Sequence, residues 1–139
     1  MTQEKKKVLF ICTHNSARSQ MAEGLLNALG GDRYEAFSAG TETSDVRPQA
    51  VEAMREIGID ISDHYSKGLE PFLDKELDVV VTVCDRARES CPYFPGGKEV
   101  LHKGFDDPSA GQGTQEEKMR VFRRTRDEIR DWIQEAFLG

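Results

Sequence analysis

The stretch "VLFICTHNSARS" (Val8–Ser19) decides the fold. Its first five residues form an unbroken apolar run, which is typical of a strand covered on both faces within a parallel sheet. From Ser19 onward, apolar residues recur along a helical stripe until Gly30 and Gly31, which predicts a helix with a glycine stop. The stretch therefore predicts a strand, a turn that begins at Cys12, and a helix.

Strand-like and helix-like segments alternate along the rest of the chain. Apolar and β-branched runs predict three further strands, at residues 34–40, 77–85 and 99–105. A short helix or a loop separates the last two strands. Amphipathic patterns predict two further helices, one that begins near Pro48 and ends just before Gly58, and one at residues 115–137. Such alternation is typical of an α/β fold with a four-stranded parallel sheet flanked by helices on both faces, in three layers (α/β/α). The length fits a single domain spanning 1–139.

Composition and charge limit the partners that the chain can have. Apolar residues make up 37% and charged residues 32%, as in a soluble globular protein. The formal net charge of −6 argues against nucleic acid or a membrane surface as a partner, and an anionic substrate would need a strong local positive site. The apolar run before Cys12 is too short for a signal peptide or a membrane span. We therefore expect a cytoplasmic protein, a monomer by default, whose three cysteines are thiols at rest.

Three chemically notable segments follow three different predicted strands. Cys12 ends the first strand, Cys84 lies at the end of the third, and Asp106, Asp107 and Pro108 follow the fourth. In open α/β sheets, ligands bind beyond the carboxyl ends of the strands. The fold therefore predicts that these distant segments converge at one site.

The turn between Cys12 and Arg18 predicts an oxyanion site. Backbone N–H groups of such a turn point into one concavity, and the helix that follows adds partial positive charge. Arg18 can clamp two oxygens of a tetrahedral oxyanion with its planar guanidinium group. The same field is expected to lower the pKa of Cys12, whose thiolate would be the nucleophile. The oxyanion-binding residues are then Thr13, His14, Asn15, Ser16, Ala17, Arg18 and Ser19.

Two polar residues of this turn have expected supporting roles. Ser19 can donate a hydrogen bond to the Cys12 thiolate. Asn15 can hold the loop through bonds to its backbone, and asparagine tolerates left-handed geometry. The plainer alternative is that Cys12 is only a small buried apolar residue at the end of a strand. Its place between a strand and a helix favours the functional interpretation.

At these residues the chain resembles a known family. The motifs "CTHNSARS" (12–19), "SAG" (38–40) and "FDDP" (105–108) are similar to those of the low-molecular-weight protein tyrosine phosphatase superfamily, and the resemblance covers nearly the whole chain. A finer resemblance, to the thioredoxin-coupled arsenate reductase branch, is carried by "SQMAEG", "DISDH", "VVTVCDRARESCP" and "GFDDPSAG". The combination of these motifs is highly specific.

The resemblance implies that arsenate is reduced to arsenite by a relay of three cysteines. The Cys12 thiolate would attack arsenic, and Asp107, which directly precedes a proline as in the superfamily, would protonate the departing oxygen; Asp106 is the runner-up. Cys84 would then attack Cys12, and Cys91 would attack Cys84. Thioredoxin is the implied electron donor, no cofactor is tightly bound, and phosphate or sulfate would mimic the substrate. A glutaredoxin-coupled variant of the fold exists, and no residue here excludes that donor.

Cys84 and Cys91 lie seven residues apart, which is neither a zinc-site nor a thioredoxin-motif spacing. Seven residues of helix span about 10.5 Å, whereas a disulfide requires Cα atoms within about 4.4–6.8 Å of each other. If these two cysteines pair, the segment between them must therefore unwind or loop out. No metal is expected, because ligand spacing is also missing from the histidines, which we interpret as surface or structural residues: His14, His64 and His102.

Two positions depart from the pattern of the phosphatase relatives. Ala17 stands where those enzymes often carry a second cysteine, so Cys12 cannot form a disulfide within the loop. Ser109 stands where they usually carry a tyrosine that contacts an aromatic substrate. The partner of Cys12 must therefore lie elsewhere, and Cys84 is the candidate.

A third departure concerns a cation beside the loop. The resemblance implies a potassium ion in some arsenate reductases, held by residues that match Asn15, Glu23 and Ser38 together with an aspartate. The aspartate position is Lys67 in this chain. Our hypothesis is that the Lys67 ammonium group fills the place of the ion and pairs with Glu23. The loop-stabilising residues are then Asn15, Ser19, Glu23, Ser38 and Lys67.

Two other functions stay open at this point. A phosphatase would need only Cys12, Arg18 and Asp107, and would make no use of Cys84 or Cys91. An oxyanion-binding or redox-sensing module would need neither the aspartate nor a resolving pair of cysteines.

Overall fold

Four strands form one sheet in the computed structural model, which describes residues 5–84, 87, 89, 97–110 and 112–139. The sheet order is β2-β1-β3-β4, and each neighbouring pair is parallel. The prediction of a four-stranded parallel sheet is therefore confirmed. The strands are β1 (Lys6–Cys12), β2 (Tyr34–Gly40), β3 (Leu77–Thr82) and β4 (Gly97–His102).

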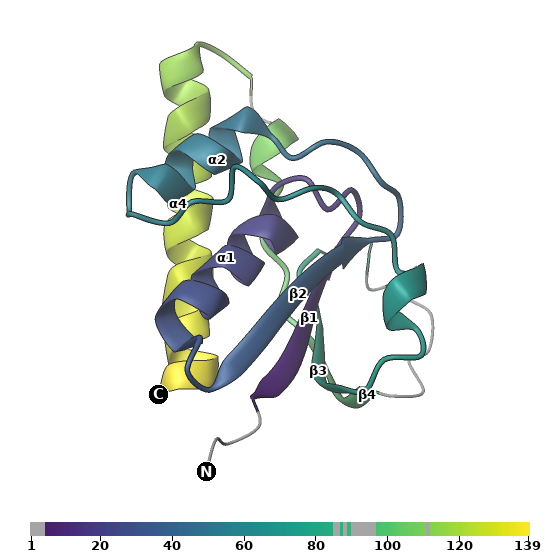
Figure 1. Cartoon of the computed structure of the whole chain (residues 1–139). Helices are drawn as coiled ribbons and strands as arrows, with labels where there is room; N and C mark the ends of the chain where they lie inside the picture. Colours follow the sequence, from purple (N-terminus) through teal and green to yellow (C-terminus); the bar gives the residue numbers. More distant parts are fainter. Residues whose placement is uncertain (1–4, 85–86, 88, 90–96, 111) are drawn as a thin grey trace.

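Helices complete the three-layer α/β/α fold that the sequence predicts. In Figure 1 the helices α1, α2 and α4 lie on one side of the sheet, and the 3-10 helix η1 lies on the other. The α-helices are α1 (Arg18–Gly30), α2 (Pro48–Arg55) and α4 (Gln115–Ile133). Three short elements are η1 (Glu70–Phe72), the 3-10 helix η2 (Pro108–Ala110) and the π-helical turn η3 (Gln134–Leu138).

Both faces of the central strand β1 are covered, which explains the unbroken apolar run in its sequence. Leu9 and Phe10 have no exposed surface although they point to opposite faces. The Phe10 ring meets the edge of the Phe137 ring on the helical side, at 6.2 Å between centroids. On the other side, Phe37 of β2 packs against Phe72 of η1 at 5.7 Å. Burial on two faces is the physical basis of the predicted parallel sheet.

Element boundaries differ from the expected ranges by a few residues. The strands β3 and β4 are shorter than expected, yet hydrogen bonds from Lys103 N to Thr82 O (2.9 Å) and from Phe105 N to Val83 O (3.0 Å) continue their pairing. The helix expected between Pro48 and Gly58 ends at Arg55, and Gly58 lies just past its end with a φ of 81°, as predicted. The short helix or loop expected between β3 and β4 falls largely outside the described residues.

A buried arginine fixes α4 against α2. The Arg126 side chain is 8% exposed, and its Nη1 donates hydrogen bonds to Ala53 O (2.8 Å) and Glu56 Oε1 (3.0 Å). Arg123, one turn earlier, also binds Glu56, at 2.8 Å from Nη2 to Oε2. These contacts join the carboxyl end of α2 to the middle of α4, and the two helices lie on the same side of the sheet (Figure 1).

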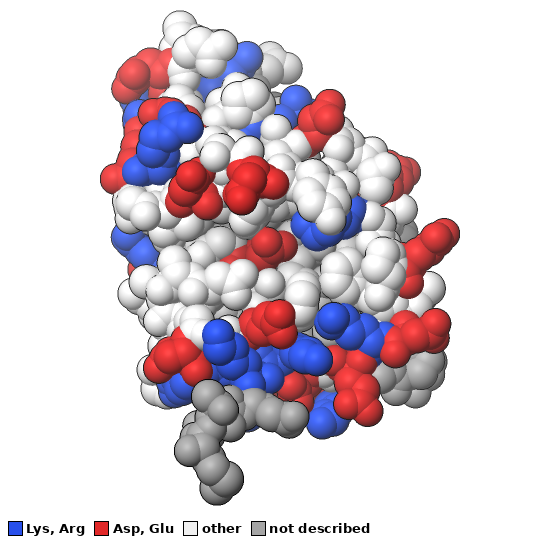
Figure 2. Space-filling model, viewed as in Figure 1, with Lys and Arg blue, Asp and Glu red and all other residues white. Residues whose placement is uncertain are grey.

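Charged side chains of both signs share the surface. On the face shown in Figure 2, lysine and arginine side chains are interspersed with aspartate and glutamate around the amino-terminal end of the sheet. No helix among the described residues is long and apolar enough to cross a membrane.

The β1–α1 loop packs directly on the end of β2. A Cβ atom added at Gly40 would lie 2.6 Å from Glu42 O, 2.8 Å from Thr13 O and 2.9 Å from Asn15 N, which are all backbone atoms. The loop can approach β2 this closely only because residue 40 has no side chain.

We predict that Gly40→Ala destabilises the protein by about 1–3 kcal/mol, the usual cost of overpacking, and displaces the β1–α1 loop. Gly68→Ala is the matched control, because Gly68 pairs with Gly40 but a Cβ there would meet only Thr43 Cγ2, at 3.8 Å. Urea unfolding followed by circular dichroism measures both changes. Equal losses in the two variants would contradict the prediction.

Candidate active site

The β1–α1 loop is built around a left-handed asparagine. Asn15 is fully buried and has a φ of 51°, in agreement with the expectation that this residue tolerates left-handed geometry. Its Nδ2 donates a hydrogen bond to Ser19 Oγ at 2.8 Å. The expected bond from Ser19 to Cys12 is not among the hydrogen bonds of the described residues. Ser19 therefore supports the loop through Asn15 in this state.

Backbone hydrogen bonds join the loop to the segment after β2. Glu42 N donates to Thr13 O at 2.8 Å, and Arg47 N donates to Ser16 O at 2.8 Å. These bonds engage the Thr13 and Ser16 carbonyl groups. Among the described residues, the N–H groups of residues 14–17 donate no backbone hydrogen bond, so they are available to a ligand. The loop can thus serve as the predicted oxyanion cradle.

Arg18 begins α1 and points toward the chain after β4. Its side chain is only 12% exposed, its Nη1 donates to Phe105 O at 3.0 Å, and its Nη2 lies 3.9 Å from Asp107 Oδ2. Asp107 also accepts a hydrogen bond from Ser109 N at 2.9 Å. Asp106 is exposed and has no hydrogen bond or ion pair within the described part of the chain. The geometry therefore favours Asp107 over Asp106 as the carboxyl group of this site.

Two cysteines from different strands meet at the cradle. Cys12 Sγ lies 3.5 Å from Cys84 Sγ, and the two residues are 3% and 4% exposed. Both are free thiols. Thr13 Oγ1 lies 3.3 Å from Cys84 Sγ. The predicted convergence of the segments after β1, β3 and β4 is therefore present, whereas Cys91 lies outside the described residues.

The thiol pair shares one proton, and this corrects an expectation. Because the Cys12 thiol donates a hydrogen bond to Cys84, the pKa of Cys84 is lowered to about 5, although burial opposes this shift. The same hydrogen bond, together with burial, raises the pKa of Cys12 despite the nearby charge of Arg18. The expected lowering of the Cys12 pKa is therefore wrong for this state. A second thiolate 3.5 Å from the first would be strongly disfavoured.

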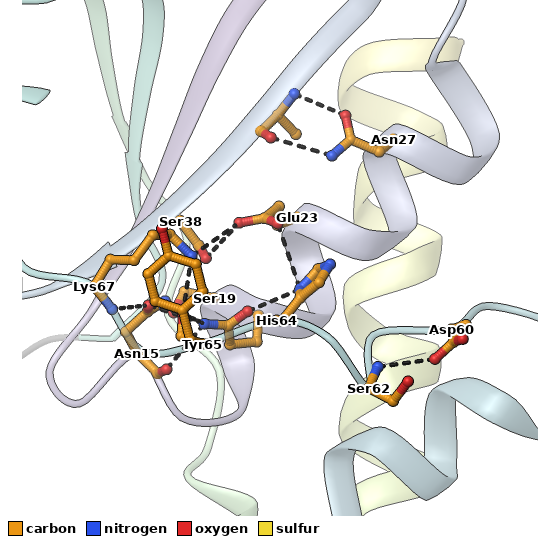
Figure 3. Close-up of polar contacts among 12 residues, drawn as sticks. Asn15, Ser19, Glu23, Asn27, Ser38, Asp60, Ser62, His64, Tyr65 and Lys67 are labelled. Carbon is orange, nitrogen blue, oxygen red and sulfur yellow. Dashed lines mark hydrogen bonds and ion pairs between the residues drawn. The ribbon is translucent and has the colours of Figure 1, made fainter. Parts of the chain in front are cut away.

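A polar network under the loop is centred on Glu23 (Figure 3). Ser38 Oγ donates to Glu23 Oε1 at 2.7 Å. His64 Nδ1 lies 3.4 Å from Glu23 Oε2, and Lys67 Nζ lies 3.7 Å from Glu23 Oε1. The expected pairing of Lys67 with Glu23 is thus present. In addition, Lys67 N donates to Asn15 Oδ1 at 2.9 Å, which links this network to the loop.

Sequence reasoning missed Gln20, which connects the network to the loop. Gln20 is fully buried on α1, and its Nε2 donates to Asn15 Oδ1 at 2.9 Å and to Tyr65 O at 3.0 Å. Its Oε1 lies 2.9 Å from His64 Nδ1. The available signal was a glutamine on the apolar side of a predicted helix, directly after the loop. His64 is structural, as expected, but its contacts are with the loop support.

Two other residues of the predicted oxyanion loop, His14 and Ala17, make few side-chain contacts that bear on the site. His14 is exposed, and its Nδ1 lies 3.5 Å from Glu42 Oε2. Ala17 is 1% exposed and caps α1 without a side-chain bond. The residues that the structure describes contain no group of three or more histidine, cysteine, aspartate or glutamate side chains that could hold a metal ion.

Comparisons with known proteins agree with this geometry. An arsenate reductase of Halalkalibacterium halodurans is 52% identical over 125 residues, which is 90% of each chain. A solved arsenate reductase in the phosphate binding state superimposes with a TM-score of 0.81 at 34% identity, over 94% of this chain and 95% of that one. The Corynebacterium glutamicum thioredoxin-dependent arsenate reductase gives a TM-score of 0.68 at 29% identity, over 99% of this chain and 65% of that one. The model of the low molecular weight phosphotyrosine protein phosphatase family matches residues 7–137, so the chain belongs to this family.

Proposed function

We propose that this protein reduces arsenate to arsenite with its own thiols and is regenerated by thioredoxin. The observation that carries the proposal is the 3.5 Å separation of Cys12 Sγ and Cys84 Sγ beside the oxyanion loop. A phosphatase needs one thiolate and an acid, whereas a thiol-based reductase needs a second thiol within reach of the first. The names of the similar proteins, one of them thioredoxin-dependent, support the same reaction.

The first step forms a bond between sulfur and arsenic. Arsenate binds to the loop N–H groups and to the Arg18 guanidinium group, and the proton of Cys12 passes to Cys84. The Cys12 thiolate then attacks arsenic, and an oxygen leaves as water after Asp107 donates a proton. The thiol adduct still contains arsenic(V), so no electrons have been transferred at this stage.

The second step transfers two electrons. Cys84 first loses the proton that it took from Cys12, which passes to an oxygen of the arsenic adduct. The Cys84 thiolate then attacks Cys12 Sγ, a disulfide forms, and the sulfur–arsenic bond breaks with its electron pair on arsenic, which leaves as arsenite. Cys91 next attacks Cys84 Sγ, which frees Cys12 as a thiolate and leaves a Cys84–Cys91 disulfide. A thioredoxin dithiol reduces that disulfide and becomes oxidised itself. Glutaredoxin with glutathione is the alternative donor.

Hydrolysis of phosphate monoesters is the second candidate function. Arg18, Asp107 and the loop are the parts that a phosphatase of this family would use, and the family is named for that reaction. Ser109 follows the proline where a tyrosine would contact an aromatic substrate. We therefore expect this activity to be weak.

Replacing each cysteine by serine separates the candidates. We predict that Cys12→Ser lowers both arsenate reduction and aryl phosphate hydrolysis by at least about 10³-fold, since the nucleophile is lost. Cys84→Ser should abolish arsenite release but retain the hydrolysis of aryl phosphates. Cys91→Ser should release one equivalent of arsenite and stop as a Cys12–Cys84 disulfide, detected by intact mass.

These outcomes are measured by arsenite assay in the presence of thioredoxin, thioredoxin reductase and NADPH. A parallel reaction with glutathione and glutaredoxin tests the donor. Continued multiple turnover of Cys84→Ser or Cys91→Ser would contradict the relay.

The shared proton predicts a thiolate at mildly acidic pH. In a Cys91→Ser background, ultraviolet thiolate absorbance should appear as pH rises through about 5, the pKa of Cys84, and should disappear as pH falls below it. Removing the donor with Cys12→Ala should move this midpoint to higher pH. Cys84→Ser serves as the control, and survival of the low midpoint in that variant would assign the thiolate to another sulfur.

We propose that Lys67 replaces a bound potassium ion, because its ammonium group lies 3.7 Å from Glu23 Oε1 and 3.0 Å from Tyr65 O. A potassium site does not fit beside this group, since two cations would share one carboxylate. At constant ionic strength, exchange of sodium for potassium should change the reduction rate by less than about twofold. Lys67→Asp should lower the melting temperature and make it respond to potassium. Strong potassium activation of the unmodified protein would overturn this assignment.

A further inference from the structure

A small basic hollow lies beside the oxyanion loop and has no part in the relay. It is a cavity of about 110 Å³ at the start of α2, between η2 and the first turns of α4. In Figure 1 these three elements lie together above the carboxyl ends of the strands. The hollow is lined by Arg47, Gln49, Pro108, Ser109, Lys118 and Phe122.

The charge of the hollow is entirely positive. Among the described residues that line it, the ionisable ones are Arg47 and Lys118, and none is an aspartate or a glutamate. Within the described residues, neither cation forms an ion pair or a side-chain hydrogen bond. Most other lysines and arginines near α4 do have carboxylate partners, as Arg123 and Arg126 have Glu56. Two unpaired cations in a protein with a net charge of −6 form a local positive site.

Two further polar groups are available to a ligand there. The Ser109 hydroxyl oxygen is buried and has no hydrogen-bond partner among the residues that the structure describes, and leaving such a group unsatisfied costs about 1–3 kcal/mol. Gln49 lies in the first turn of α2, where backbone N–H groups have no partner within the helix and partial positive charge gathers. The residue before α2, Arg47, is joined to the oxyanion loop by its backbone bond to Ser16 O at 2.8 Å.

We propose that this hollow is a second oxyanion site, which binds a tetrahedral anion of the arsenate and phosphate class next to the catalytic loop. The Arg47 and Lys118 side chains supply the charge, and the Ser109 hydroxyl supplies a hydrogen bond. The site holds the substrate anion before it enters the cradle. Its role in catalysis rests on the proposed function, whereas its affinity for an anion does not.

The positive charge of the hollow counteracts the repulsion between the negatively charged protein and an anionic substrate. A protein with a charge of −6 repels a dianionic substrate at long range, and that repulsion lowers the rate of encounter. Local cations next to the site reverse the sign of the field where the substrate approaches. Electrostatic steering of this kind changes association rates by about 10–10³-fold, and added salt screens it.

The first experiment measures binding and needs no activity. Phosphate is titrated into the reduced protein, and backbone amide chemical shifts are followed by NMR. The Gln49 amide should saturate with a dissociation constant different from that of the Ser16 amide in the cradle. In the Arg47→Gln/Lys118→Gln protein, the Gln49 curve should be lost and the Ser16 curve kept. A Gln49 response that follows Ser16, or that never saturates and so reports an adventitious ion only, would overturn the site.

The second experiment measures steering with a charge-matched control. Arg120 and Arg124 are exposed, and helical geometry of about 100° per residue turns them away from Lys118 and Phe122. Arg47→Gln/Lys118→Gln should lower kcat/KM for arsenate by about tenfold at low salt through KM, with kcat unchanged and with a weaker salt dependence. Arg120→Gln/Arg124→Gln removes the same charge and should have little effect. Equal effects of the two double variants would contradict the proposal.

Negative results in the two experiments would contradict different proposals. If the protein does not reduce arsenate at all, the proposed function fails, but the phosphate titration still decides whether the second site exists. If arsenate is reduced and the Gln49 amide does not saturate independently, the second site alone is wrong. Circular dichroism of both double variants verifies that each remains folded.

Discussion

The parallel pairing of β1 with β3 is the constraint on which the site depends. It sets Ile11 opposite Thr82, so that the next residues of the two strands leave the sheet side by side. Cys12 and Cys84 are 72 residues apart in sequence, yet their sulfurs lie 3.5 Å apart. A slip by one residue would turn one of the two side chains to the other face of the sheet. The contact between the sulfurs is therefore a consequence of strand register, and the proposed oxyanion loop is anchored to the same strand.

This contact also controls where the charge is in the resting state. A lone cysteine between an arginine and a helix N-terminus would carry a lowered pKa. With a second thiol at hydrogen-bonding distance, the pair loses one proton easily and the other only with difficulty. Transfer of the remaining proton from Cys12 to Cys84 does not change the total charge of the pair. In the proposed reaction, the nucleophile can thus form when a dianion is bound, and Cys84 must lose that proton to another group before it attacks.

The sequence predicted the parts of this site that follow from topology. The places of Cys12, Cys84 and Asp107 at strand ends, and the turn before Arg18, could be derived from alternating elements and a short motif. The roles of Gln20 and His64 could not be derived from the sequence. They depend on which residues of α1 and of the segment after α2 face the buried Asn15. The direction of the Cys12 pKa shift was wrong for a related reason. It depends on a distance of 3.5 Å between two sulfurs, which no spacing in the sequence determines.

The same loop can support two reactions, and the central atom of the substrate separates them. After the Cys12 sulfur bonds to phosphorus, attack by a second thiol has no productive outcome, because phosphorus(V) is not reduced by thiols, and the intermediate can only be hydrolysed. After the sulfur bonds to arsenic, the adduct can release arsenite with the bonding electron pair, provided that a second thiol reaches Cys12 Sγ. A second sulfur 3.5 Å away can convert the adduct to product only in that case. The position of Cys84 is therefore the feature that suits this phosphatase-type site to a redox reaction.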